Sequence, residues 1–200
     1  MTEIPLFPMP LVIFPGGRLP LQIFETRYLD MVKYCLRSDS GFGIVMITEG
    51  SQILNNPDEQ LPAIKHCGTY CTITDFDELA NGMLGITVEG QKKFVIRDEW
   101  EQPDRLMMGN VEFLADEEDV EMPEAQEHLS GLLESLMSHE AVQRIGLSCD
   151  LNQAVEVGAR LTELLPCPND FKQRMLEVKD PLVRLEEIEK LVDQIQKAQS

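Results

Sequence analysis

Five prolines between residues 5 and 20 constrain the start of this chain more than any other feature of the sequence: Pro5, Pro8, Pro10, Pro15 and Pro20. Proline has no N–H group and a fixed φ angle, so this region cannot be a helix interior, and its prolines cannot donate to a sheet ladder. The apolar runs from Leu11 to Phe14 and from Leu19 to Phe24 are therefore predicted to be short strands. Gly16-Gly17 is predicted to form the sharpest turn between them.

At Glu25 the apolar pattern changes from strand to helix. Tyr28, Val32 and Cys35 follow at helical spacing, which predicts a helix at about residues 25–37. Glu25 stands in the first turn, where a carboxylate meets the positive end of the helix dipole. Because Glu25 and Arg27 are two positions apart on a helix, we expect their side chains to point in different directions.

The motifs of this segment resemble the start of the N-terminal substrate-binding domain of the ATP-dependent Lon protease family. The similar motifs are Pro5-Leu-Phe-Pro8, Phe14-Pro15-Gly16, Pro20-Leu21 and Phe24-Glu25-x-Arg27-Tyr28. The end of that domain is similar to Leu165-Pro166, Lys172-Gln173, Leu176-Glu177 and Arg184-Leu185. The resemblance covers about Ile4 to Leu191. It implies an α+β fold, namely a PUA-like β pseudo-barrel followed by a C-terminal helical bundle.

The pattern along the chain predicts two parts and a link. Residues 1–115 read as a β-rich barrel with one helix, and the strands after that helix are predicted at Phe42 to Thr48, Gly68 to Phe76, Met83 to Val88, Lys93 to Trp100 and Met107 to Leu114. A break is expected at Gly90. Residues 116–122 form an acidic link, and residues 123–200 form a helical bundle, in which Asp150 and Gln153 are expected to form a capping box.

The net charge of −18 is concentrated in one part of the sequence. Between Asp98 and Glu140 there are fourteen acidic residues and one basic residue, Arg105. This window is either a solvated acidic face or a docking surface for a basic partner. It disfavours nucleic acid as a partner, because binding to a phosphate backbone depends on Lys and Arg.

The sequence contains no apolar run near the roughly 18 to 20 residues that span a bilayer, and its acidic start is unlike a signal peptide. We therefore expect a cytoplasmic protein without a membrane partner. The five cysteines are odd in number and irregularly spaced, which argues against a disulfide framework. Cys67 and Cys71 are about 13 Å apart along a predicted strand, so they are not expected to share a metal ion. We expect no metal site and no cofactor.

The motifs that would indicate catalysis are incomplete. Residues 85–92 have the glycine spacing of a phosphate loop, but Gln91 stands where lysine is required. Ser148 lacks the second glycine of a nucleophile elbow, because Asp150 takes its place. We therefore expect no enzyme activity, and neither the ATPase nor the peptidase module of the full-length protease.

The first hypothesis for function is a stand-alone, non-enzymatic module that binds unfolded or extended polypeptide, or another protein. Its candidate site is an apolar groove between barrel and helix that is lined by Phe14, Pro15, Arg18, Phe24 and Tyr28. Phe24 is expected to be packed at this junction. The alternatives are an RNA-binding PUA-like protein and an uncatalogued hydrolase. We expect a monomer or a weak homodimer.

Overall fold

The computed structural model describes residues 1–53 and 59–199 of the chain. The chain divides into two compact units, unit 1 at Met1–Ala115 and unit 2 at Asp116–Ser200. In the described residues, unit 1 holds a six-stranded sheet with one helix, and unit 2 is helical. The α+β fold class predicted from the sequence is confirmed.

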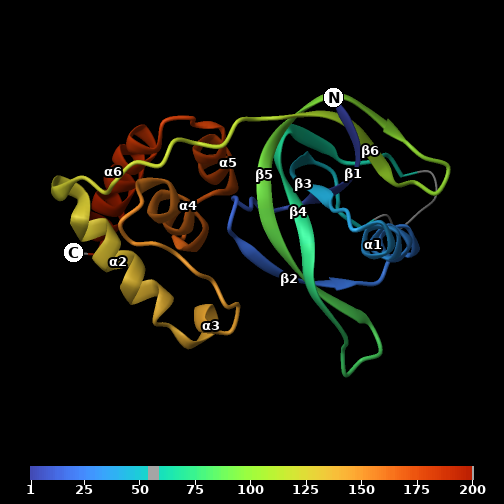
Figure 1. Ribbon diagram of the computed structural model, residues 1–200, viewed down its shortest axis with the longest axis horizontal. Coiled ribbons are helices and arrows are strands. Elements are labelled where there is room, and N and C mark those ends of the chain that lie inside the picture. The colour runs from blue at the N-terminus through green and yellow to red at the C-terminus, as the bar shows by residue number, and fades with distance from the viewer. Residues whose placement is uncertain (54–58, 200) are drawn as a thin grey trace. The chain divides into compact units, whose positions relative to one another are not determined.

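The sheet of unit 1 closes on itself into a barrel (Figure 1). Its strands are β1 (Thr2–Met9), β2 (Arg18–Ile23), β3 (Phe42–Glu49), β4 (Ala63–Glu78), β5 (Leu84–Glu101) and β6 (Met107–Phe113). Their order is β2-β5-β4-β3-β1-β6, and the additional β5–β6 pairing closes the ring. The β1–β3 pair is parallel and the other pairs are antiparallel. This architecture is consistent with the PUA-like pseudo-barrel that we expected.

The first strand tolerates two prolines because each lies where β1 has a single neighbour. Pro5 pairs with β6 before the contact with β3 begins at Leu6. Pro8 pairs with β3 after the contact with β6 has ended. A missing N–H group therefore removes no hydrogen bond on the unpaired side.

The strand that we predicted at Leu11 to Phe14 is wrong, since this run is irregular in the structure. It is nevertheless buried from Val12 to Phe14. The backbone carbonyl of Ile13 accepts a hydrogen bond of 2.6 Å from the hydroxyl of Thr69. The prolines that interrupt the strand pattern here therefore mark a buried connection.

The break predicted at Gly90 is also wrong, because β5 continues through it as one strand. A Cβ atom at Gly90 would lie 2.2 Å from the carbonyl oxygen of Phe14. Gly90 also donates a 2.9 Å hydrogen bond to Gly17 and accepts one of 2.8 Å from Gly16. This glycine thus permits the close approach of another backbone, which is a common reason for glycine inside a strand.

The helix predicted at 25–37 is α1 (Thr26–Ser38), which lies against one side of the barrel (Figure 1). Its inward face places Tyr28, Met31, Val32 and Cys35 in the main hydrophobic core of unit 1. The same core receives Ile23, Ile86 and Val88 from the strands. One face of β2 and β5 is therefore turned toward α1, and the opposite face is left outside this core.

Strands β4 and β5 extend beyond the closed barrel. Pairing of β4 with β3 ends at Cys71, whereas pairing of β4 with β5 continues to Glu78. In this extension β5 lies between β4 and β2. We call these three segments, residues 18–23, 72–78 and 84–89, the strand arm.

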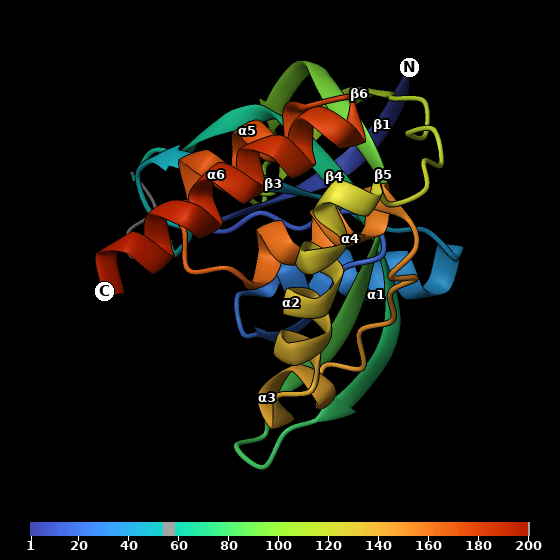
Figure 2. The same ribbon diagram turned by 90° about the vertical axis from the view of Figure 1, so that its left-hand side faces the viewer.

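Unit 2 is a bundle built around α4 (Ala154–Leu164), which contacts α2 (Glu127–Met137), α5 (Asn169–Glu177) and α6 (Pro181–Gln199) (Figures 1 and 2). The short helices η1 (Glu124–Gln126) and α3 (Glu140–Gln143) flank α2. Aliphatic side chains from α2, α4 and α6 form its core, among them Leu129, Leu133, Val157, Leu161, Leu185, Ile188 and Val192. None of the helices within residues 1–53 and 59–199 is both long and apolar enough to cross a membrane.

The predicted capping box at Asp150 and Gln153 is wrong. The N-cap of α4 is Gln153, which makes no side-chain capping hydrogen bond. The carboxylate of Asp150 instead accepts a 2.9 Å hydrogen bond from the backbone N–H of Asn152, two residues later. Asp150 therefore stabilises a turn before the helix, which is a common alternative role of aspartate.

The acidic residues 116–122 are bound to the helices of unit 2. The carboxylate of Glu117 pairs with the guanidinium of Arg184, whose side chain is 1% exposed. Val120 accepts a 2.8 Å hydrogen bond from the backbone of Ala154, and Met122 donates one of 2.8 Å to Asn152. The segment is thus held by a buried ion pair and by main-chain hydrogen bonds.

Candidate functional site

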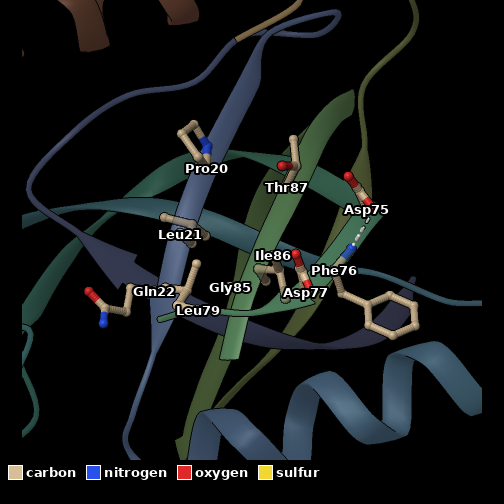
Figure 3. Close-up of a pocket in the computed structure, with 10 residues that line it drawn as sticks. All are labelled: Pro20, Leu21, Gln22, Asp75, Phe76, Asp77, Leu79, Gly85, Ile86 and Thr87. Atoms are coloured by element: carbon tan, nitrogen blue, oxygen red, sulfur yellow. Dashed lines mark hydrogen bonds between the residues drawn. The ribbon is translucent and has the colours of Figure 1, made fainter. Parts of the chain in front are cut away.

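The strand arm carries an open hollow of about 300 Å³ (Figure 3). Ten residues line it: Pro20, Leu21, Gln22, Asp75, Phe76, Asp77, Leu79, Gly85, Ile86 and Thr87. They come from β2, β4, β5 and the turn between β4 and β5. The hollow is therefore formed by segments that are more than fifty residues apart in the sequence.

Strand register decides which side chains surround the hollow. Pro20 and Asp75 both stand beside Thr87, and in the next row Gln22 and Asp77 both stand beside Gly85. Residues two apart on a strand share a face, so all six side-chain positions are on one face of the arm. The side chain of Ile86, which stands between Gly85 and Thr87 on β5, is on the opposite face and is buried in the core.

Glycine gives the hollow its depth. Gly85 lies in the middle strand and presents no side chain to the hollow. A Cβ atom there would lie 2.8 Å from Cδ2 of Leu79, so the Leu79 side chain lies over this glycine. The floor is therefore backbone and a leucine side chain, while Pro20 and Asp77 belong to opposite strands at its sides (Figure 3).

Two of the five predicted groove residues are core residues. Phe14 is 1% exposed and Tyr28 is 3% exposed. The Tyr28 ring packs on Phe7 with 4.1 Å between ring centroids. The expectation that these two rings line an open groove is thus corrected, because both are packed inside unit 1.

The other three predicted residues are more accessible and lie on different segments. Pro15 is half-buried in the turn before β2. Arg18 is on the same face of β2 as Pro20, and its guanidinium is 3.8 Å from the carboxylate of Glu89. Phe24 follows β2 and is 50% exposed. Their role in binding stays a prediction, and Arg18 is the one that shares a strand face with the hollow.

The hollow residues were missed because periodicity does not report which strands pair. A signal was present in the exposed apolar residues beside the Asn81-Gly82 turn. Leu79 and Met83 flank this turn and are 37% and 39% exposed. Apolar side chains on both sides of a solvent-exposed hairpin turn could have directed attention to the strand arm.

The Phe24-Glu25-x-Arg27-Tyr28 motif forms a structural centre around Arg27. This guanidinium is buried and donates hydrogen bonds of 3.0 and 3.1 Å to the carbonyls of Arg105 and Gln52. It also pairs with Glu25 at 2.9 Å and lies 4.5 Å from the centroid of the Tyr28 ring. Arg27 thereby connects α1 to two other segments of unit 1.

The expectation that Glu25 and Arg27 point in different directions is wrong. Glu25 is the N-cap residue of α1 and has an extended backbone, so helical spacing does not apply to it. Burial raises the pKa of the Tyr28 phenol well above its ordinary value, which nearby Arg27 partly opposes and Glu25 reinforces. Tyr28 is consequently a neutral core side chain at physiological pH.

Exposure of Phe24 sets a limit on its contribution to stability. We expect Phe24→Ala to lower the free energy of unfolding by less than about 1 kcal/mol, because half of the side chain is already in water. Phe42→Ala is the matched control, since Phe42 is fully buried and should cost about 3 to 5 kcal/mol. Urea denaturation followed by circular dichroism compares the two variants, and equal losses would contradict this placement of Phe24.

The two segments with partial catalytic motifs have structures that differ from those motifs. Residues 85–92 lie inside strand β5, whereas a phosphate loop must turn between a strand and a helix. Ser148 is in an irregular, exposed segment before α4, without the preceding strand of a nucleophile elbow. Among the residues that the structure describes, no group of three or more His, Cys, Asp or Glu side chains could hold a metal ion.

A closed β-barrel with a protruding arm, followed along the chain by a helical bundle, is consistent with a PUA-like fold. The model of the family described as the ATP-dependent protease La (LON) substrate-binding domain matches residues 3–194. The chain belongs to this family.

Solved structures agree with this assignment. The structure is similar to the crystal structure of a Lon N-terminal domain protein from Xanthomonas campestris, at 32% identity and a TM-score of 0.74, over 94% of this chain and 97% of that one. It is also similar to the N-terminal domain of the Lon protease of Mycobacterium avium complex, at 13% identity and a TM-score of 0.56, over 94% and 96% of the two chains. The second likeness concerns the fold alone. Comparison with curated proteins gives no match.

Proposed function

We propose that this chain is a polypeptide-binding module, and that it binds extended segments of polypeptide in the hollow of the strand arm. The proposal follows from membership of a substrate-binding domain family together with the chemistry of the hollow. The observation that carries it is an open, glycine-floored depression on the solvent face of three paired strands. Catalysis has no part in the proposal.

The size of the hollow favours side chains over compact ligands. Its volume of about 300 Å³ is at the lower end of the range for small-molecule pockets, roughly 300 to 1,000 Å³. One or two apolar side chains of an extended peptide would fit this volume. Pro20 and Leu79 would contact them, and the apolar area removed from water would drive binding at roughly 25 cal/mol per Å².

The backbone of strand β2 is poorly suited to pair with a bound peptide. It is the end strand of the sheet order and pairs with β5. An unpaired strand edge usually attracts another strand, but Pro20 in the middle of β2 has no N–H group to donate. We therefore expect a bound peptide to be held mainly across the face of the arm.

RNA binding is a weaker candidate than polypeptide binding at this site. Asp75 and Asp77 line the hollow, and both would repel a phosphate backbone. A hydrolase remains the third candidate, and a screen for esterase and peptidase activity on the purified chain tests it.

Gly85→Ala tests the proposed site. A methyl group at Gly85 would fill the floor and displace the Leu79 side chain, which is flexible enough to move without disturbing β5. We expect the affinity for an extended peptide rich in Leu and Phe to fall about tenfold, which corresponds to about 1.4 kcal/mol. Fluorescence anisotropy with a labelled peptide measures it.

Gly131→Ala is the control for this experiment. Gly131 is an exposed position of α2, and a Cβ atom there would meet nothing within 4 Å. This variant should bind the peptide as the parent chain does. Unchanged binding in a folded Gly85→Ala variant would place the site elsewhere, and no binding by the parent chain would refute the proposed function.

A further inference from the structure

The hollow of the strand arm is acidic as well as apolar. Residues 72–91, which include the outer parts of β4 and β5, contain four acidic residues and neither lysine nor arginine. Two of the acidic residues, Asp75 and Asp77, line the hollow itself. The ten lining residues include no basic side chain.

The two carboxylates are held in place by their own backbone. Asp75 accepts a 2.9 Å hydrogen bond from the N–H of Phe76, as Figure 3 shows, and Asp77 accepts one of 2.8 Å from the N–H of Glu78. Each hydrogen bond uses the Oδ1 atom of the carboxylate. The negative charge is thereby fixed at one side of the hollow, and both side chains remain exposed to a ligand.

The spacing of these carboxylates matches an extended peptide. Asp75 and Asp77 are two residues apart on β4, so their positions are separated by roughly 6.5 to 7 Å along the strand. Alternate side chains of an extended ligand have the same separation. A peptide lying along the arm can therefore place cationic groups beside the carboxylates while its apolar side chains enter the hollow.

The basic residue nearest in strand register does not line the hollow. Arg18 lies opposite Glu89, one row beyond the hollow, and its guanidinium contacts the carboxylate of Glu89 and the hydroxyl of Thr74. The hollow itself is lined by Asp75 and Asp77 and by no basic side chain.

We propose that the hollow selects extended apolar segments that carry lysine or arginine next to the apolar side chains. This inference rests on the proposed function and names its class of ligand. Apolar burial would provide most of the affinity. The carboxylates would raise the affinity for apolar segments flanked by basic residues and lower it for those flanked by acidic residues.

Three labelled twelve-residue peptides with the same Leu and Phe centre test the inference, with two flanking positions occupied by lysine, serine or glutamate. Exposed ion pairs are individually weak, but attraction and repulsion both contribute to a comparison of lysine with glutamate. We expect the lysine peptide to bind the full chain about tenfold more tightly than the glutamate peptide at 0.1 M salt. At 1 M salt, where the Debye length is about 3 Å, the ratio should fall to about twofold.

The double variant Asp75→Asn and Asp77→Asn assigns the effect to the hollow. Asparagine keeps an oxygen that can accept the backbone hydrogen bond, so the fold of β4 should be preserved. The matched control is Asp98→Asn, because Asp98 accepts the equivalent hydrogen bond, of 3.0 Å, from the N–H of Glu99 but does not line the hollow. We expect the tenfold ratio to disappear in the double variant and to persist in the control.

The outcomes separate the inference from the proposed function. If the serine and lysine peptides bind equally and the glutamate peptide binds no less tightly, selection by charge is overturned and the proposed function stands. If the ratio persists in the double variant, charge selection occurs at another surface and the inference is again overturned. If none of the peptides binds, both fail.

Discussion

Arg184→Met is expected to lower the free energy of unfolding by about 3 to 5 kcal/mol, because it leaves a buried carboxylate without its partner. Arg184 projects from α6 and is 1% exposed. Its guanidinium donates to both carboxylate oxygens of Glu117, at 2.7 and 2.5 Å. It also donates to the carbonyls of Met175 and Val178, at 2.9 and 2.8 Å.

The loss concerns more than one ion pair. Met175 and Val178 are at the C-terminal end of α5, so Arg184 satisfies carbonyls that the helix leaves open. Glu117 belongs to the acidic segment that precedes the bundle. Removing the guanidinium would therefore release this segment and the end of α5 from α6 together.

The effect is measured by chemical denaturation of the protein, followed by a signal that reports on unit 2. Arg144→Met is the control. Arg144 also pairs with a glutamate, Glu140, but both side chains are exposed and the expected change is below about 0.5 kcal/mol. The double variant Glu117→Leu and Arg184→Met should recover part of the loss, since neither charge remains buried alone. A loss below about 1 kcal/mol in Arg184→Met would show that water reaches Glu117.

Arg27→Met is expected to lower the free energy of unfolding of unit 1 by about 2 to 4 kcal/mol. The substitution keeps much of the apolar length of the side chain but removes the donors for the carbonyls of Gln52 and Arg105. Leaving these partly buried acceptors without a charged donor costs more than the hydrogen bonds contribute. The carboxylate of Glu25 loses its 2.9 Å partner at the same time.

Lys33→Met is the control for Arg27, on the same helix. Lys33 pairs with Asp30 three residues earlier, and both side chains are exposed, so the expected change is small. Thermal unfolding and peptide binding are measured on both variants. Unchanged stability together with lost peptide binding would show that Arg27 acts in recognition, whereas the structure gives it a bracing role.

Much of the fold could be predicted because strands and helices have different apolar periods. The alternation from Gly68 to Phe76 and the helical spacing after Glu25 both correspond to elements of the structure. The errors occurred where a residue type has two uses. Gly90 permits close packing without a break in the strand. The prolines are compatible with β1 because each lies where β1 pairs with only one neighbouring strand.

The candidate site was harder to predict because it depends on register. Pro20, Asp75 and Thr87 become neighbours only when β2, β5 and β4 are paired in one particular alignment. The burial of Phe14 and the exposure of Phe24 depend equally on tertiary contacts, since both are aromatic residues beside a turn. The resemblance identified the family, but it did not locate the hollow.

The two ends of β4 and β5 have different roles in the fold. Their inner ends complete a closed ring, where a change in strand length or register would disturb every neighbour. Their outer ends form the arm, which takes no part in that closure. Substitutions, and even insertions at the hairpin turn, can therefore alter what the arm contacts while the ring remains intact. The proposed binding region can therefore change in sequence independently of the ring.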